Sequence, residues 1–242
     1  MDHGVKAMRI LLAYPERPCY TFPMTTKHPA KYSNQLLPIL AELAKGCGHI
    51  HDPFAGTGRI FELALHGFGG RITASEIEPE WAACHADIEI ADVLCLPYPS
   101  GWCDGIVTSP AYGNRMADSF TPGEGWGNAR SKRNTYTHAL GRKLHLHNSG
   151  QLQWGDKYRD FHERAWAECG RVLVPGGRLV LNVSDHIRGG EVQAVTDWHV
   201  GCLERLGFVV ELWCDVATRR LRWGQNGDVR VAHESVIRLE RL

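Results

Sequence analysis

The sequence lacks paired cysteines, an excess of charge of either sign and any long apolar run. Its eight cysteines are scattered and none belongs to a C-x-x-C pair, which disfavours both a zinc site of the usual spacing and a disulfide framework. No apolar stretch could span a bilayer, and the N-terminus carries too short an apolar run for a signal peptide. We therefore expect reduced thiols, no metal, no membrane partner and a cytoplasmic protein of prokaryotic or phage origin.

The charge balance also limits the kind of partner. Lys and Arg number 27, as do Asp and Glu, so the formal net charge is zero. A chain without a strong overall field can attract nucleic acid only through a local basic surface. Its 242 residues, 43% of them hydrophobic, suffice for one globular domain with a sizeable core. No internal repeat or low-complexity segment is visible, and we predict a single domain over residues 1–242.

Strand-like and helix-like segments alternate along the chain. The predicted strands are 49–53, 71–77, a short one before Asp92, 105–110, 178–185, 208–216 and 229–242. The predicted helices are 33–45, 59–68, 79–87, 158–173 and 191–206. Such alternation predicts an α/β fold with a mostly parallel sheet and helices on both faces, closed by a C-terminal antiparallel hairpin.

Polar side chains recur where the predicted strands end. The first strand runs into Asp-Pro-Phe-Ala-Gly-Thr-Gly at 52–58, where glycines allow a tight turn and close approach of a ligand to a helix N-terminus. Glu76 ends the second strand, where an acidic side chain can bind ribose hydroxyls. Asp92 and the Ser-Pro-Ala-Tyr turn at 109–112 follow the next two strands. Open α/β sheets bind ligands at this edge.

Three motifs in this order carry a family resemblance. They are KHPAKYSNQLLPIL, DPFAGTG and TSPAY. Together they resemble the amino-methyltransferases of DNA, which transfer a methyl group from S-adenosylmethionine to cytosine N4 or adenine N6. The resemblance covers residues 27–112 well and the tail from 166 more loosely. It implies a Rossmann-like methyltransferase fold and S-adenosyl-L-methionine as the cofactor.

The resemblance also assigns residues to that cofactor. Asp52 and Gly56 would frame its methionine part, beside Phe54. His28 and Pro29 would close over the same end. The remaining assignments are Gly58 in the glycine turn, Glu76 on the ribose hydroxyls, Ile77 on the adenine face and Asp92 on the adenine amino group.

The SPAY turn would carry the chemistry. A base amino group is a poor nucleophile because its lone pair is delocalised, and acceptors on its two hydrogens help to aim the nitrogen at the methyl group. The resemblance implies that Ser109 Oγ and the Pro110 carbonyl are these acceptors, and that Tyr112 stacks on a flipped base. Ala111 departs from the family, which has a second proline there, so some rigidity is lost. Serine in the first position favours cytosine N4 over adenine N6.

Residues 113–160 form an insertion that is too long for an ordinary connection. Aromatic residues are interspersed in it with basic residues, of which we assign six to nucleic-acid binding: Arg115, Arg130, Lys132, Arg133, Arg142 and Lys143. Such a mixture is typical of a surface for phosphates and unstacked bases. The alternative is a solvated loop whose aromatics pack on the domain. As a target-recognition region the insertion is small, so we expect a short recognition sequence or relaxed specificity.

The sequence thus predicts a site-specific DNA methyltransferase, of the kind found in restriction-modification systems, acting on duplex DNA with a flipped base. Two alternatives stay open. One is an RNA enzyme that methylates a base amino group, although no separate RNA-binding domain is visible. The other is a catalytically decayed methyltransferase fold that serves as a binding module.

Overall fold

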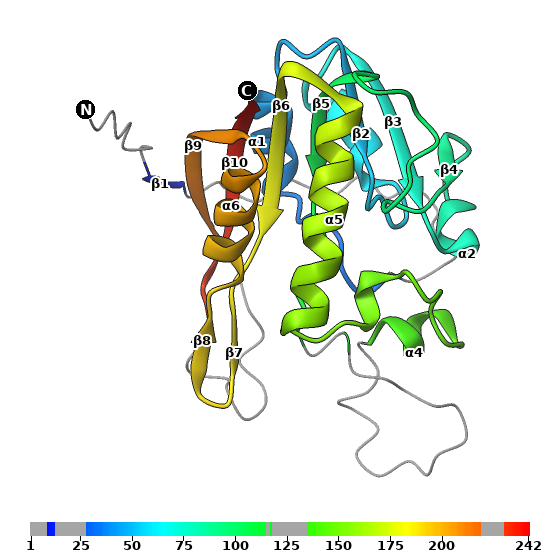
Figure 1. Ribbon diagram of the computed structural model, residues 1–242, viewed down its shortest axis with the longest axis vertical. Coiled ribbons are helices and arrows are strands. Elements are labelled where there is room, and N and C mark those ends of the chain that lie inside the picture. The colour runs from blue at the N-terminus through cyan, green and yellow to red at the C-terminus, as the bar shows by residue number, and fades with distance from the viewer. Residues whose placement is uncertain (1–8, 13–27, 115–116, 118–134, 219–229) are drawn as a thin grey trace.

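The structure, a computed structural model, describes residues 9–12, 28–114, 117, 135–218 and 230–242. Its centre is an eight-stranded sheet in the order β1-β9-β10-β6-β5-β2-β3-β4 (Figure 1). The strands are β1 (Arg9–Leu12), β2 (His49–Asp52), β3 (Arg71–Glu76), β4 (Ile88–Ile90), β5 (Cys103–Thr108), β6 (Leu173–Val183), β9 (Phe208–Ala217) and β10 (His233–Arg241). All pairings in this sheet are parallel except those of β10 with β6 and β9.

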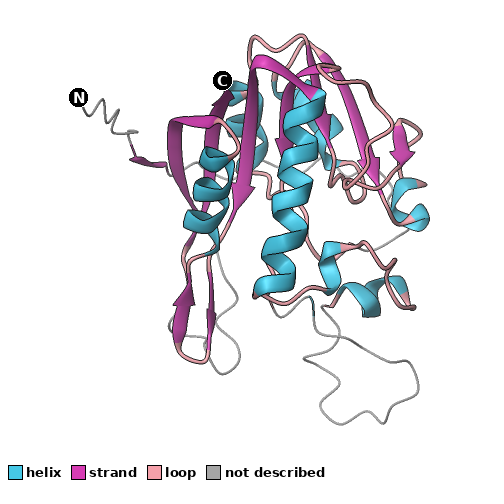
Figure 2. Cartoon of the chain, viewed as in Figure 1, coloured by secondary structure: helices cyan, strands magenta, loops and turns pink. Residues whose placement is uncertain are grey.

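Helices cover both faces of the sheet (Figure 2). They are α1 (Leu36–Leu43), η1 (Arg59–His66), α2 (Pro79–Ala82), α4 (Tyr136–Leu140), η3 (Ser149–Gln151), α5 (Asp156–Val172) and α6 (Val195–Arg205). Helices α1 and η1 pack in one apolar core, which includes Leu40 and Ile60. Helices α5 and α6 pack in a second core around Trp166 and Leu179. The predicted α/β class, with a mostly parallel sheet and a C-terminal antiparallel pair, is confirmed.

Several predicted boundaries were wrong. The helix predicted over 191–206 begins only at Val195, because residues 186–193 form a hairpin of β7 (His186–Arg188) and β8 (Glu191–Gln193). Gly189 and Gly190 both have positive φ, as a two-residue hairpin turn requires. The edge strand β1 was not predicted.

Two of the short helices also differ from the prediction. The helix predicted over 59–68 is present as a 3-10 helix, but it ends at His66. Helix α2 ends at Ala82 instead of continuing to residue 87. After it the backbone bonds tighten to i→i+3, with Cys84 N–H donating to Trp81 O and His85 N–H to Ala82 O. The tighter turns let the chain enter β4 at Ile88.

The parallel strands bring their carboxyl ends to one edge of the sheet. From β2 the chain runs through β3 to β4 on one side, whereas β5, β6 and β10 lie on the other. The boundary between β2 and β5 is therefore a topological switch point, where open α/β sheets form a ligand crevice. None of the helices in the described part of the chain combines the length and the apolar character needed to cross a membrane.

Candidate functional site

A pocket opens at this switch point, and most of the predicted site residues line it. The predicted residues in its wall are His28, Pro29, Phe54, Gly56, Glu76, Ile77, Ser109, Pro110 and Tyr112. Three residues predicted for the cofactor lie outside the wall: Asp52, Gly58 and Asp92. The structure therefore brings together the residues after β2, β3 and β5, together with the HPA segment at 28–30.

Asp52 supports the glycine turn from behind. Its buried carboxylate accepts hydrogen bonds from Thr108 Oγ1 (2.6 Å), the Phe54 amide (3.0 Å) and the Tyr32 hydroxyl (3.1 Å). Burial raises the pKa of this carboxyl to about 6, although the three donors oppose that rise. Asp52 thus ties β2 to the end of β5 and to the segment that precedes α1, and it acts on the pocket through the shape of the turn.

Gly56 and Gly58 suit the turn for two reasons: its backbone conformation favours glycine, and neighbouring atoms leave little room for a Cβ. Gly56 and Gly58 have φ of 54° and 86°, in the left-handed region that favours glycine. A Cβ on Gly56 would lie 3.2 Å from His28 Nε2, and one on Gly58 would lie 2.9 Å from Ile88 Cδ1. Gly56 therefore lets the HPA segment approach the turn closely, while Gly58 lets β4 pack against it.

Glu76 presents a buried carboxylate at the end of β3. It accepts hydrogen bonds from the amides of Gly56 (2.9 Å) and Glu78 (3.0 Å), and 7% of its surface is exposed. Burial raises its pKa to about 7, against the lowering effect of these two donors. A ligand that donates hydrogen bonds to this carboxylate would favour the charged form. The Glu76 carboxylate therefore lies where it can accept hydrogen bonds from the hydroxyls of a ligand.

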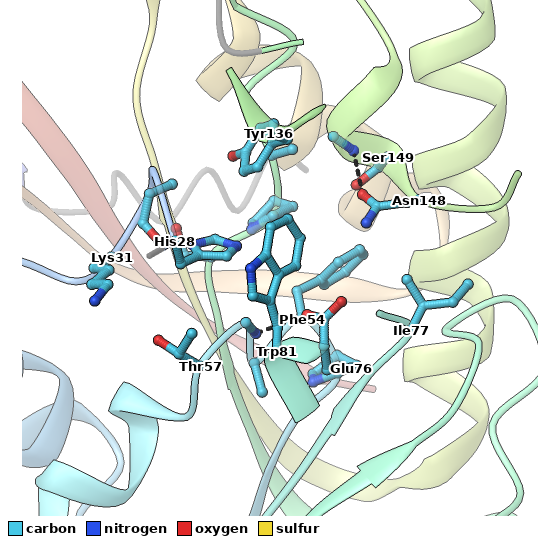
Figure 3. Close-up of a pocket in the computed structure, with 18 of the residues that line it drawn as sticks. His28, Lys31, Phe54, Thr57, Glu76, Ile77, Trp81, Tyr136, Asn148 and Ser149 are labelled. Atoms are coloured by element: carbon cyan, nitrogen blue, oxygen red, sulfur yellow. Dashed lines mark hydrogen bonds between the residues drawn. The ribbon is translucent and has the colours of Figure 1, made fainter. Parts of the chain in front are cut away.

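An aromatic wall lies beside Glu76, and two of its three members, Trp81 and Tyr136, were not predicted from the sequence. It consists of His28, Trp81 and Tyr136, which gather around the pocket in Figure 3. The ring centroids are 4.3 Å apart for His28 and Trp81 and 6.1 Å apart for Trp81 and Tyr136. Burial lowers the pKa of His28 to about 4, so the imidazole is neutral at pH 7. Trp81 Nε1 is buried and finds no acceptor among the described residues.

The SPAY turn places its hydroxyls in one network. Ser109 Oγ lies 3.0 Å from the Tyr112 hydroxyl. Asn182 Nδ2, on β6, is 3.2 Å from Ser109 Oγ and 3.0 Å from the Tyr112 hydroxyl. Glu234, on β10, accepts from the Tyr112 hydroxyl (3.3 Å) and from Asn182 Nδ2 (3.1 Å), and it also lines the pocket. Asn182 and Glu234 were not predicted as site residues.

The turn is held at Ala111, where the resembled family has proline. The Ala111 carbonyl accepts a hydrogen bond of 2.6 Å from the Tyr158 hydroxyl on α5. Tyr158 is bonded in turn to His199 Nε2 on α6 (2.9 Å), and all of these groups are buried or partly buried. A side chain from α5 thus restrains the backbone that a second proline would have stiffened.

The described second half of the insertion closes the pocket. Glu78, which is fully buried, accepts hydrogen bonds from Arg142 Nη2 (2.8 Å), the His145 amide (2.6 Å) and Asn148 Nδ2 (2.9 Å). In Figure 3, Asn148 and Ser149 face the pocket from the side opposite Thr57. The insertion therefore contributes to the wall of the pocket as well as to the surface.

The residues predicted for nucleic-acid binding have different outcomes. Arg142 is bonded to Glu78 and Glu80, so its guanidinium holds the insertion in place. Lys143 is exposed. The others lie outside the described residues: Arg115, Arg130, Lys132 and Arg133. Nucleic-acid contact by these six stays a prediction.

Asp92, predicted for the adenine amino group, accepts from the Leu94 amide and lies 2.5 Å from His147 Nδ1.

Glu78→Ala should loosen the insertion more than Arg142→Ala. Loss of the carboxylate leaves the His145 amide and the Asn148 side chain without their acceptor, which costs about 2–3 kcal/mol of stability. Arg142 is 40% exposed in its side chain, and its removal should cost about 1 kcal/mol or less because solvent screens such pairs. Urea unfolding of both variants measures the difference. Equal losses would show that the ion pair, rather than the buried acceptor, holds the segment.

Within the described residues, no group of three or more His, Cys, Asp or Glu side chains is arranged to hold a metal ion. The wall of the pocket instead offers hydroxyls, two buried carboxylates (Glu76 and Glu234) and aromatic rings. This arrangement suits an organic ligand with hydroxyl and amino donors.

Comparison with known proteins identifies the fold. No protein-family model matches the sequence, and no curated protein matches it. Among solved structures, the [4+2]-cyclase SpnF aligns with a TM-score of 0.54 at 15% identity, covering 85% of this chain and 79% of its own. A SAM-dependent methyltransferase from Methanosarcina mazei gives 0.52 at 14% identity, covering 85% of this chain and 97% of its own.

A third similar structure, the PH0226 protein from Pyrococcus horikoshii OT3, gives a TM-score of 0.51 at 12% identity, covering 86% of this chain and 88% of its own. One of the three is a cyclase and another a methyltransferase, so the shared architecture does not by itself specify the reaction. Identities this low establish the fold alone. The chain has the Rossmann-like methyltransferase fold.

Proposed function

We propose that the protein is an S-adenosylmethionine-dependent methyltransferase that acts on the exocyclic amino group of a base in DNA, with cytosine N4 favoured over adenine N6. The observation that carries the proposal is the shared pocket. Ser109, Pro110 and Tyr112 line the same cavity as Glu76 and Gly56. A methyl donor and an acceptor base must meet in one site, and the turn that resembles the catalytic motif lies beside the turn that resembles the cofactor motif.

The pocket residues fit S-adenosylmethionine. Glu76 offers a buried carboxylate for ribose hydroxyls, and Ile77 lies next to it in the wall for the adenine face. The unsatisfied Trp81 Nε1 can donate to a ligand oxygen or nitrogen. The rings of Trp81 and Tyr136 suit a cationic sulfonium. When bound, the cofactor supplies an electrophilic methyl group.

The SPAY turn supports an amino group as the acceptor. Ser109 and Pro110 both line the pocket, and the serine hydroxyl and the proline carbonyl would supply the two acceptors that the hydrogens of an amino group require. The neighbouring Tyr112 ring gives a flat surface for a flipped base. The aromatic and basic residues of the insertion suit a nucleic acid rather than a small metabolite.

A methyl-transfer assay on duplex DNA, followed by digestion to nucleosides, tests the proposal directly. We expect N4-methylcytosine, with N6-methyladenine as the second outcome. Transfer to RNA alone would replace DNA by RNA as the substrate. Binding of the cofactor without transfer to either nucleic acid would contradict the proposal and favour a decayed binding module.

Glu76→Ala should weaken S-adenosylmethionine binding by about 1–3 kcal/mol, because charge-assisted hydrogen bonds to the two ribose hydroxyls are lost. Calorimetry on the purified variant measures the change in affinity. Glu89→Ala is a matched control, since Glu89 lies on the neighbouring strand β4 and is exposed. An unchanged affinity in Glu76→Ala would remove this residue from the cofactor site.

A further inference from the structure

A buried carboxylate stands next to the hydroxyls of the SPAY turn. Glu234 is 8% exposed, lines the pocket and accepts from the Tyr112 hydroxyl at 3.3 Å. Ser109 Oγ lies 3.0 Å from the same hydroxyl. The result is a continuous chain of polar atoms from Ser109 through Tyr112 to Glu234. Ser109 and Tyr112 belong to the TSPAY motif, whereas Glu234 lies outside all three sequence motifs.

The topology explains how Glu234 reaches this place. β10 is antiparallel to its neighbours, so its N-terminal end lies at the edge where the parallel strands end. Ser109 follows β5, Asn182 lies near the end of β6 and Glu234 lies near the start of β10, on three adjacent strands. Asn182 is 1% exposed, and its Nδ2 lies within 3.2 Å of an oxygen of each of the other three residues. It therefore fixes the spacing of the network.

We propose that Glu234 accepts, through the hydroxyls of Tyr112 and Ser109, the proton that a substrate amino group releases on methylation. The inference rests on the proposed function. The amino nitrogen forms a bond to the methyl carbon, and the sulfur–carbon bond breaks with its electron pair staying on sulfur. One amino proton passes to Ser109 Oγ while the Ser109 proton moves to the Tyr112 oxygen and the Tyr112 proton moves to Glu234. The products are a neutral methylated amine, a thioether and a protonated Glu234.

The other acidic residues are poorly placed for this task. Among the described residues, Glu76 and Glu234 are the carboxylates in the pocket wall. Glu76 is bonded to the amides of Gly56 and Glu78, away from the hydroxyls of the SPAY turn. Asp52 lies outside the wall and is occupied by Thr108. Glu234 is the carboxylate that the hydrogen-bonded chain reaches.

Glu234→Gln and Tyr112→Phe test the relay, separately and combined. Gln keeps an oxygen that can accept from Tyr112, and Phe keeps the ring that could stack on a base, so each variant removes proton transfer while sparing the simpler role. We expect each to lower the single-turnover rate of methyl transfer about 100-fold, within the range of general-base effects. The double variant should be little slower than either one, because one chain is broken in all three. Glu240→Gln, on the same strand, is the control and should keep the wild-type rate.

The rate is measured at saturating S-adenosylmethionine and duplex DNA, with calorimetry to show unchanged cofactor affinity. Single variants within about threefold of the wild-type rate, a span too small for general-base catalysis, would overturn the relay and leave the proposed function standing. So would losses that multiply in the double variant. A wild-type protein without methyl transfer to DNA or RNA would overturn both. If one single variant does not fold, the other still interrupts the chain and decides the outcome.

Discussion

Ser109→Ala should lower the rate of methyl transfer by about 10²–10³, the usual loss when a hydrogen bond to the reacting group is removed from the transition state. Ser109 Oγ and the Pro110 carbonyl are the two acceptors that we propose for the amino group. Its loss removes an acceptor from the amino group and interrupts the contact with Tyr112 at 3.0 Å. Cofactor affinity should stay near normal because the residues on the ribose side are untouched.

Single-turnover kinetics on duplex DNA and calorimetry with S-adenosylmethionine separate the two effects. Ser100→Ala is the matched control, since Ser100 is exposed in the loop before β5, at the opposite end of that strand from Ser109. A Ser109→Ala variant with the wild-type rate would show that the turn does not position the amino group. A large loss of cofactor affinity instead would move Ser109 from the substrate to the cofactor.

The second large effect is acid unfolding below about pH 4.5, driven by buried histidines. His51, His162 and His199 are fully buried. Burial lowers the pKa of His51 and of His162 to about 3, and that of His199 well below its ordinary value. Because the unfolded chain binds these protons near pH 6.5, the stability they give is fully present above that pH and falls as the pH drops towards 3.

Two buried carboxyls have the opposite effect on the stability of the fold over part of this pH range. The pKa of Asp52 is raised to about 6 and that of Glu76 to about 7, so both favour the folded state increasingly as the pH falls from 7 to about 4. Below the ordinary carboxyl pKa this compensation stops growing, whereas the histidines continue to lose stability. A tenfold difference in proton affinity between the folded and unfolded chain corresponds to about 1.4 kcal/mol. The histidines can therefore offset much of a domain's stability of about 5–15 kcal/mol.

Circular dichroism from pH 7 to 3 should therefore show little change down to about pH 4.5 and cooperative unfolding below it, as the histidine linkage requires. His162→Phe should move the midpoint to lower pH, because it removes one buried base and keeps a ring against Phe54. His66→Phe, at an exposed position, is the control and should leave the midpoint unchanged. A midpoint above about pH 6, or one that His162→Phe does not move, would contradict this account.

The motifs that could be predicted are those that are contiguous in the sequence. The turn at 52–58 and Glu76 follow predicted strands directly, and parallel pairing brings such positions to one edge. Ser109 and Tyr112 were found in the same way. Each lies within a few residues of a strand end, so local pattern and strand direction were enough to place it.

The residues that escaped prediction depend on pairing between distant segments. Asn182 and Glu234 meet Ser109 only through the order β5-β6-β10 and the reversed direction of β10. Tyr158 donates to the Ala111 carbonyl only because of where α5 packs in the fold. One signal was present, since Glu234 lies two residues before the apolar pair Val236 and Ile237 in a predicted strand, and a carboxylate is seldom buried without a partner. Arg142 was assigned to phosphate binding from composition, which could not show that Glu78 and Glu80 lie next to it.

The short connection between Glu76 and Glu78 has a thermodynamic consequence. Glu76 accepts from the Glu78 amide, and the Glu78 side chain holds Arg142, His145 and Asn148. A ligand that shifts this stretch of backbone also shifts the segment that closes the pocket. If the cofactor strengthens nucleic-acid binding through that movement, the nucleic acid must strengthen cofactor binding by the same factor. Binding of the two partners would then be cooperative, with the coupling carried by the stretch of chain from Glu76 to Glu78.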